Sequence, residues 1–256
     1  MECLINTIGY LSKSEVRLEI LDVIDSEPLD LRDLMDITGS PRTTLQRNLS
    51  LLIERGWIDE SPTGYTTTTT GSFLLREAKK TNKVVEKIHE IRPLIELIPS
   101  SSEINIRRLN NFNVIVPDCS SPYRPANHLR ESINASEYIR GVVSFMPKII
   151  VDRFFDLSPE SFDNEEFILT ERAYSSLMEK TTSTPKWVSN SNYPDIRIFE
   201  NDFPYSLFIL DEKILLAACD NIGRLEVLVE ADCEESLNWA ENIYSTHRLE
   251  SSLPNI

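Results

Sequence analysis

Two short segments with apolar residues at helical spacing meet at the tripeptide Gly39-Ser40-Pro41, and this turn constrains the fold most. Before the turn, Asp30 is positioned to cap a helix. The apolar residues of that helix are Leu31, Leu34, Met35 and Ile37. Gly39 can adopt the positive φ with which helices end. Ser40 as N-cap and Pro41 at the first helical position favour a new helix over residues 41–55. Two helices joined by such a turn form a helix-turn-helix.

A further helix precedes this pair, and a β-hairpin follows it. Apolar residues recur at helical spacing after Ser14, which predicts a helix over residues 14–25 with Ser14 as its N-cap. Two strand-like stretches, 57–60 and 65–68, are separated by a turn that contains proline and glycine. Three helices and a hairpin in this order predict an α+β winged helix-turn-helix domain over residues 1–72.

The predicted helix over residues 41–55 is amphipathic. One face carries Leu45, Leu49, Leu52 and Ile53. The opposite face is polar, and residues 40–56 contain three arginines but one glutamate, so this stretch is locally basic. Arginine and glutamine can hydrogen-bond base edges, while hydroxyl groups and arginine hold phosphates. We therefore expect this helix to read DNA in the major groove; the alternative is an ordinary solvated face.

The residues expected to contact DNA include two on the hairpin. They are Ser40, Arg42, Thr43, Thr44, Gln46, Arg47, Ser50, Thr63 and Tyr65. The hairpin tip could reach along the DNA backbone, but it lacks lysine and arginine. A passive hairpin is therefore the alternative for the wing.

The net charge of −15 narrows the kinds of partner that the chain can have. It argues against a generally basic nucleic-acid coat protein and against adhesion to an anionic membrane. Residues 1–98 carry 12 basic and 16 acidic groups, and residues 99–256 carry 14 and 25. Only 9 of the 26 basic residues are lysines, and an acidic, lysine-poor composition is typical of a high-salt cytosol or of an ordinary acidic protein. Phosphate binding by such a chain should be weak, so base contacts, shape and dimerisation must contribute more.

A long helix is predicted from Gly71 onward. Apolar positions then alternate in steps of three and four, as in a coiled-coil seam. The residues expected to dimerise are Val84, Ile88, Ile91, Ile95 and Ile98. The alternative is that this seam packs on the chain's own C-terminal domain. Pro93 should kink the helix or open a new one, and Pro99 with the serines after it indicates a linker, so residues 73–109 are expected to be a dimerisation helix and linker.

Residues 110–256 alternate between strand and helix patterns and end in a run of strands, which predicts an α/β domain with a mixed sheet. The predicted strands lie near 114–116, 138–145, 167–169, 196–198, 206–210, 214–219 and 225–229. The predicted helices lie near 127–133, 149–159, 173–178 and 233–248.

Several motifs in the first 72 residues resemble those of archaeal winged-helix transcriptional regulators. They are Ser40-Pro41-Arg42-Thr43-Thr44-Leu45, Leu51-Leu52-Ile53-Glu54-Arg55-Gly56-Trp57-Ile58 and Tyr65-x-x-Thr68-x-x-Gly71. The resemblance implies double-stranded promoter or operator DNA as a partner, and a homodimer. With the composition, it points to a haloarchaeal protein.

The C-terminal part resembles the effector domain of methanogenesis-type archaeal regulators. Its strand order is also similar to TrmB-like sensor domains, which share a phospholipase-D-like fold. The residues that carry the resemblance are Ile139-Arg140-Gly141-Val142-Val143 through Pro147, Phe167-Ile168-Leu169-Thr170 and the segment 208–216. It implies a non-catalytic domain through which a small-molecule or protein signal modulates activity. A protein-interaction adaptor that kept a winged helix without reading DNA is the alternative.

Catalysis and metal binding find little support in the sequence. The phosphodiesterase form of such a fold needs a histidine with a lysine two residues on, yet the residues at that offset from the three histidines are Ile91, Arg130 and Leu249. No P-loop, G-x-S-x-G or H-E-x-x-H motif occurs, and no two of the four cysteines form a Cys-x-x-Cys pair. We expect no enzyme activity, metal or cofactor. Neither a membrane span nor a signal peptide is readable, so a cytoplasmic location is expected.

An effector site is harder to locate. Tyr123, Arg124, His128 and Arg130 gather cationic and aromatic groups that could bind an anion. The alternative is a solvated loop and helix start. A second possibility is a ligand under the Ser-, Asn- and Pro-rich stretch 181–194, which Trp187, Tyr193 and Tyr205 mark.

Overall fold

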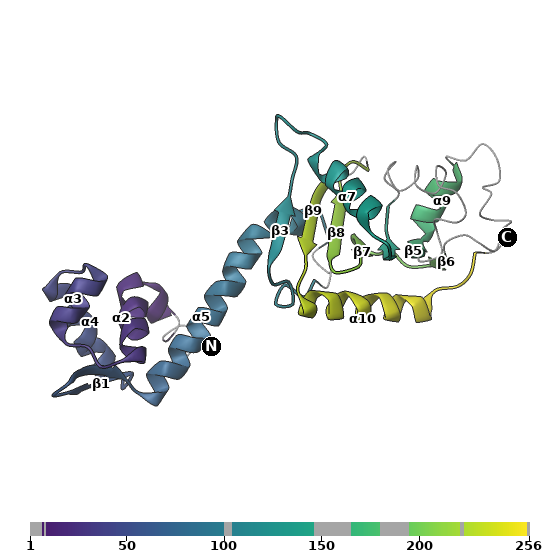
Figure 1. Cartoon of the computed structure of the whole chain (residues 1–256). Coiled ribbons are helices and arrows are strands. Elements are labelled where there is room, and N and C mark those ends of the chain that lie inside the picture. Colours follow the sequence, from purple (N-terminus) through teal and green to yellow (C-terminus); the bar gives the residue numbers. More distant parts are fainter. Residues whose placement is uncertain are drawn as a thin grey trace. The chain divides into compact units, whose positions relative to one another are not determined.

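The computed structural model describes residues 7, 9–99, 104–145, 165–179, 195–220 and 223–254. The chain divides into two compact units, Met1–Glu86 and Lys87–Ile256 (Figure 1). The boundary between the units falls inside the predicted linker 73–109, so residues 87–109 belong to the C-terminal unit. Leu94 and Leu109 are completely buried in the core of that unit.

The N-terminal unit is a winged helix-turn-helix, as predicted. Its elements are α2 (Glu15–Ser26), α3 (Leu31–Thr38), α4 (Arg42–Glu54), β1 (Ile58–Ser61), β2 (Gly64–Thr67) and α5 (Thr69–Glu90). Strands β1 and β2 pair antiparallel, and Leu29 pairs with Tyr65 of β2 through two backbone hydrogen bonds. The three helices enclose one core, built on Ile20, Ile24, Leu34, Leu45, Leu49, Leu52 and Trp57.

Local capping explains where the helices of this unit begin and end. The Asp30 side chain accepts from the backbone amides of Arg32 (2.7 Å) and Asp33 (2.9 Å), which completes a capping box on α3. Gly39 ends that helix at φ 63°, as predicted. The prediction of Ser40 as the N-cap of α4 is wrong: Pro41 is the N-cap, and its carbonyl accepts the amides of Thr44 and Leu45.

The C-terminal unit contains a seven-stranded mixed sheet, as predicted, in the order β3-β9-β8-β7-β4-β5-β6. Its strands are β3 (Phe112–Ile115), β4 (Ile139–Val143), β5 (Glu165–Thr170), β6 (Asp195–Phe199), β7 (Ser206–Ile209), β8 (Ile214–Cys219) and β9 (Leu225–Ala231). Strands β4, β5 and β6 are parallel, and the other neighbours pair antiparallel. The helices are α6 (Arg92–Ile95), α7 (Arg124–Ala135), α9 (Glu171–Glu179) and α10 (Glu234–Glu250). The predicted helix near 149–159 and the loop 181–194 lie outside the described residues.

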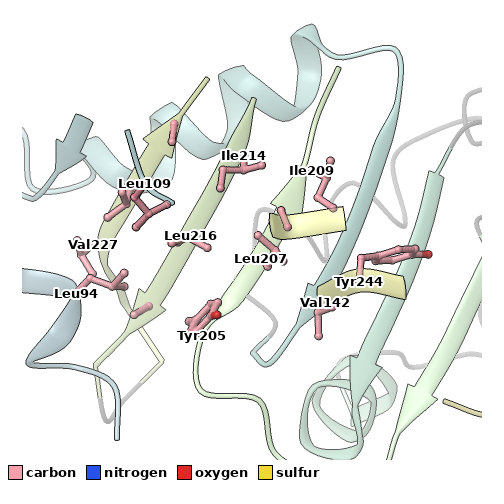
Figure 2. Packing of buried hydrophobic residues seen from close by; sticks show 14 of the residues in the cluster. Leu94, Leu109, Val142, Tyr205, Leu207, Ile209, Ile214, Leu216, Val227 and Tyr244 are labelled. Atoms are coloured by element: carbon pink, nitrogen blue, oxygen red, sulfur yellow. The ribbon is translucent and has the colours of Figure 1, made fainter. Parts of the chain in front are cut away.

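Helices cover both faces of the sheet, because its central strands are apolar on both sides and must be buried. Helices α7 and α9 pack on one face through Leu129, Ile133, Ala173 and Leu177. Helices α6 and α10 pack on the other face, against the cluster that contains Leu207, Ile209, Ile214 and Leu216 (Figure 2). The unit is therefore a three-layer α/β/α sandwich.

The residues of the predicted dimer seam fall into two groups, one packed inside the C-terminal unit and one accessible. Ile91 is completely buried in the C-terminal unit, and Ile95 and Ile98 pack against the same cluster. For these three residues the alternative of intramolecular packing holds. Pro93 opens the new helix α6 rather than continuing α5. Ile88 is 41% exposed and Val84 is half-buried, so only the N-terminal part of the seam remains accessible.

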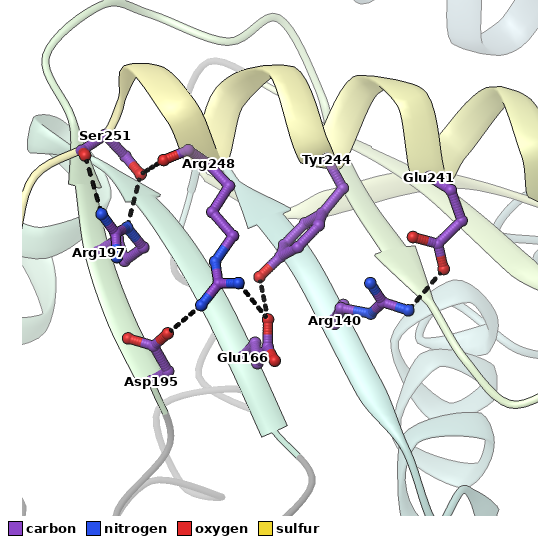
Figure 3. A network of polar contacts seen from close by, with 8 residues as sticks. All are labelled: Arg140, Glu166, Asp195, Arg197, Glu241, Tyr244, Arg248 and Ser251. Atoms are coloured by element: carbon purple, nitrogen blue, oxygen red, sulfur yellow. Dashed lines mark hydrogen bonds and ion pairs between the residues drawn. The ribbon is translucent and has the colours of Figure 1, made fainter.

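Polar contacts fasten α10 to the strands beneath it (Figure 3). The Tyr244 hydroxyl donates to Glu166 Oε2 at 2.7 Å, and Arg248 Nη2 lies 2.8 Å from Asp195 Oδ2. Nearer the start of α10, Glu241 accepts a hydrogen bond from Arg140 of β4. Burial, and then the bond to Glu166, raise the pKa of Tyr244, so its hydroxyl stays protonated and acts as the donor.

Replacing Tyr244 with phenylalanine is expected to lower the free energy of unfolding of the C-terminal unit by about 2 kcal/mol, because the partly buried Glu166 carboxylate loses a donor. Urea denaturation measures this change. Tyr174→Phe is the matched control, since Tyr174 is also partly buried but its hydroxyl makes no hydrogen bond within the described residues. Equal effects of the two substitutions would contradict the role given to the Glu166 contact.

Two absences hold for the described part of the chain. No helix there combines the length and hydrophobicity that crossing a bilayer requires. Nor do any three of its His, Cys, Asp or Glu side chains gather as a metal site would need.

Candidate nucleic-acid interface

The two faces of α4 differ as the sequence predicts. Leu45, Leu49 and Leu52 are buried against the core, although Ile53 is 38% exposed at the end of the helix. The outward positions are exposed side chains, namely Arg42, Thr43, Gln46, Arg47 and Ser50. Ser40 and Thr44 are half-buried at the start of the helix. Within the described residues, no carboxylate forms an ion pair with either arginine of this face, so both guanidinium groups are available to a ligand.

One buried polar residue joins α4 to α2. The Asn48 side chain donates to the carbonyl of Thr44 at 3.0 Å and accepts from Arg17 Nε at 2.9 Å. Arg17 also donates to the carbonyl of Tyr10 and lies over the Tyr10 ring at 3.9 Å. These contacts hold the Arg17 guanidinium beside the polar face of α4.

A shallow hollow of about 420 Å³ lies where these two helices begin. It is lined by Lys13, Ser14, Arg17, Thr43, Thr44, Arg47 and Asn48. Three of these residues are cationic, and none is acidic. The first turns of α2 and α4 contribute to it, and helix N-termini present free amides and a positive dipole end. The chemistry of the hollow suits a phosphate group.

Lys13 and Arg17 were not predicted as site residues. Their positions around the start of α2 are visible in the sequence, but an isolated lysine and arginine in a charged chain carry no further signal. Only the packing of α2 on α4 through Asn48 brings them to Thr43 and Arg47.

The two residues predicted on the wing lie in different environments. Thr63 lies exposed in the turn, where its hydroxyl hydrogen-bonds that of Ser61 at 2.8 Å. Tyr65 packs on the core of the N-terminal unit and pairs with Leu29. Burial, and then the hydrogen bond to Glu60, raise the pKa of Tyr65. Tyr65 therefore supports the wing structurally. Of the two predicted wing residues, Thr63 is the one exposed at the tip.

The predicted anion site in the C-terminal unit is not assembled. Tyr123 is 67% exposed, and Arg130 donates to Asn127 on its own helix. Arg124 lies 3.9 Å from Asp118. His128 Nε2 lies 2.9 Å from Glu230, which also accepts from Lys213 at 2.7 Å. Carboxylates therefore lie beside Arg124 and His128, whereas Arg130 contacts a neutral amide.

Glu230 provides a pH test of this cluster. Burial raises its pKa, but the hydrogen bonds from Lys213 and His128 outweigh burial, so the pKa lies below the usual 4.5. A carboxyl group whose pKa is lower in the folded than in the unfolded protein stabilises the fold at pH values above its unfolded pKa. This stability is lost as the pH falls through the folded pKa. Glu230→Gln is expected to destabilise the unit by about 1 kcal/mol at pH 7. In urea denaturation the difference from wild type should shrink below about pH 4.5; a difference independent of pH would contradict the assignment.

Comparisons with known proteins agree with the two-unit division. Residues 5–90 match the HVO_A0261 N-terminal domain. Residues 122–250 match the middle domain of the methanogenesis regulatory protein FilR1. The comparison with curated proteins gave no match.

Three solved structures are similar to the chain at low identity. TrmBL2, an archaeal chromatin protein, is 14% identical, covering 96% of this chain and 98% of its own, with a TM-score of 0.39. Nuc of Salmonella typhimurium, a phospholipase D family member, is 15% identical (57% and 100% covered, TM-score 0.41). NucT from Helicobacter pylori is 12% identical (56% and 100%, 0.37).

The family assignment rests on the longer of the two domain matches, which spans α7 to the end of α10 and half of the 256 residues. The predicted resemblance to methanogenesis-type regulators is confirmed. The chain belongs to the family of the FilR1 middle domain, preceded by an HVO_A0261-type N-terminal domain.

Proposed function

We propose that the chain is a sequence-specific DNA-binding transcriptional regulator whose helix α4 enters the major groove. One observation carries the proposal: an unpaired basic and amide-bearing helix face continues into a cationic hollow, in a chain of net charge −15. Nothing in the fold of the N-terminal unit requires that face, because its core is complete without it. The regulatory role of the FilR1 family agrees with this proposal.

The contacts would divide between phosphate and base. Lys13, Arg17 and the hydroxyls at the start of α4 would bind a backbone phosphate and fix the register of the helix. Gln46 and Arg47, which are exposed on α4, would then face base edges, where glutamine pairs well with adenine and arginine with guanine. Phosphate contacts position the domain, and these two residues give it specificity.

Two further elements belong to the proposal. A homodimer would let two winged helices read symmetric half-sites, and the exposed Ile88 with Val84 is the accessible part of the seam. The C-terminal unit would receive a small-molecule or protein signal without catalysing a reaction. The protein would act in the cytoplasm, where its DNA lies.

Genome-wide immunoprecipitation of the tagged full chain tests the proposal. It is expected to give reproducible DNA peaks that share a sequence motif. Reproducible protein partners without DNA peaks would instead support an adaptor that retained a winged helix.

A further inference from the structure

A cavity of about 790 Å³ opens beside α10 in the C-terminal unit. Its volume falls in the range of small-molecule sites, about 300–1,000 Å³. The residues that define its chemistry are Asn105, Asp202, Phe203, Tyr205, Trp239 and His247. It does not include any residue of the anion site predicted from the sequence.

The aromatic wall of this cavity is built by two elements of the C-terminal unit. Trp239 and His247 lie eight residues apart on α10 and therefore share one helix face, while Phe203 and Tyr205 precede β7 (Figure 2 labels Tyr205). The Phe203 ring centroid lies 4.6 Å from that of Tyr205 and 4.8 Å from that of His247. Tyr205 is 1% exposed, so the wall is anchored in the core.

The polar groups of the cavity are mainly acceptors. Asp202 is an exposed carboxylate at the cavity, and within the described residues no basic group pairs with it. His247 Nδ1 lies 2.8 Å from the carbonyl of Ile243, so Nδ1 is the donor of this hydrogen bond. Asn105 contributes an amide, and no described lysine or arginine lines the cavity.

We propose that this cavity binds a small organic ammonium cation of the methylated type. Aromatic faces attract such cations through their quadrupoles, and methyl groups pack on the same rings. Asp202 would supply the opposite charge at the cavity. An anion would meet an unpaired carboxylate there and no permanent cation. That the bound cation acts as the regulatory signal rests on the proposed function.

Choline and its uncharged isostere 3,3-dimethylbutan-1-ol test the charge requirement directly. The full chain is titrated with each by calorimetry, with sodium chloride adjusted to constant ionic strength. Choline is expected to bind at least about tenfold more tightly than the alcohol. Equal affinities would overturn the cation proposal in favour of a neutral apolar ligand, and no binding of choline would overturn it outright.

Three variants locate the site. Asp202→Asn and Trp239→Leu are each expected to weaken choline binding about tenfold or more. Glu200→Gln is the matched control, because it removes the same charge from an exposed residue that does not line the cavity. Wild-type affinity in Asp202→Asn, or equal losses in Asp202→Asn and Glu200→Gln, would overturn the assignment.

DNA binding is measured on the same preparations without choline. A chain that binds DNA but not choline overturns the cavity proposal alone. A chain that binds choline but not DNA supports the cavity and overturns the proposed function, so the two failures are distinguishable.

Discussion

Replacing Arg47 with alanine is expected to weaken binding of the full chain to its DNA site by about 1–3 kcal/mol, or roughly 5- to 150-fold. Arg47 is exposed on α4 and also lines the cationic hollow, so the substitution removes a potential base contact and a phosphate neighbour together. The core should be unaffected, because the Arg47 side chain points away from Leu45 and Leu49. Fluorescence anisotropy with a labelled duplex measures the change.

Lys83→Ala controls for net charge in this experiment. Lys83 is an exposed residue of α5, in the same unit but outside α4 and the hollow. Removing this charge should change the affinity for DNA only slightly, because salt screens an exposed charge that lies away from the DNA contact. Wild-type affinity in Arg47→Ala, or equal losses in both variants, would contradict the role of Arg47.

Replacing Gly71 with alanine is expected to destabilise the N-terminal unit by about 3 kcal/mol. A Cβ at this position would lie 2.0 Å from the carbonyl oxygen of Trp57, and that oxygen already accepts the amide of Thr68 at 3.0 Å. The clash is with backbone, so no side-chain rotation can relieve it. The wing and the first turn of α5 must separate instead.

Hydrogen exchange of the backbone amides around residues 57–75 measures this loss. Protection there should fall by a factor of about 100 in Gly71→Ala. Gly9→Ala is the matched control, because nothing lies within 4 Å of a Cβ built at Gly9. Unchanged protection in Gly71→Ala would show that α5 tolerates the side chain and would contradict the close approach.

The N-terminal fold was predictable because its signals are local. Asp30 caps the start of helix α3 and Gly39 caps its end, and both caps make contacts within a few residues. The Thr68-x-x-Gly71 motif has the same character: Thr68 Oγ1 accepts the amide of Gly71 at 3.1 Å and donates to the carbonyl of Gly56 at 2.8 Å. Such motifs depend on contacts between residues that are close in the sequence, so they can be predicted from the sequence.

Features that depend on distant packing were missed or misplaced. The spacing of Ile91, Ile95 and Ile98 fits a partner helix as well as it fits their own domain, and only the fold shows that they pack on their own domain. In the predicted anion site, Arg124 lies beside Asp118 and His128 lies beside Glu230 of a distant strand. A sequence shows the charges but not their pairing.

Of the residues that line the aromatic cavity, the sequence singled out Tyr205 alone as marking a ligand site. Trp239, Ile243 and His247 recur every four residues, which is also the pattern of an ordinary buried helix face. In the structure Ala240 and Tyr244 are buried in the core, whereas Trp239 and Ile243 pack against that core and, with His247, also line the cavity.

The most direct test of the central claim is selection of DNA sites from a randomised duplex library by the full chain and by a Gln46→Ala variant. If α4 reads bases, the wild type enriches one motif, and the variant loses discrimination at one position of each half-site while the rest of the motif is kept. No enriched motif, or the same motif with undiminished discrimination from both proteins, would contradict the claim.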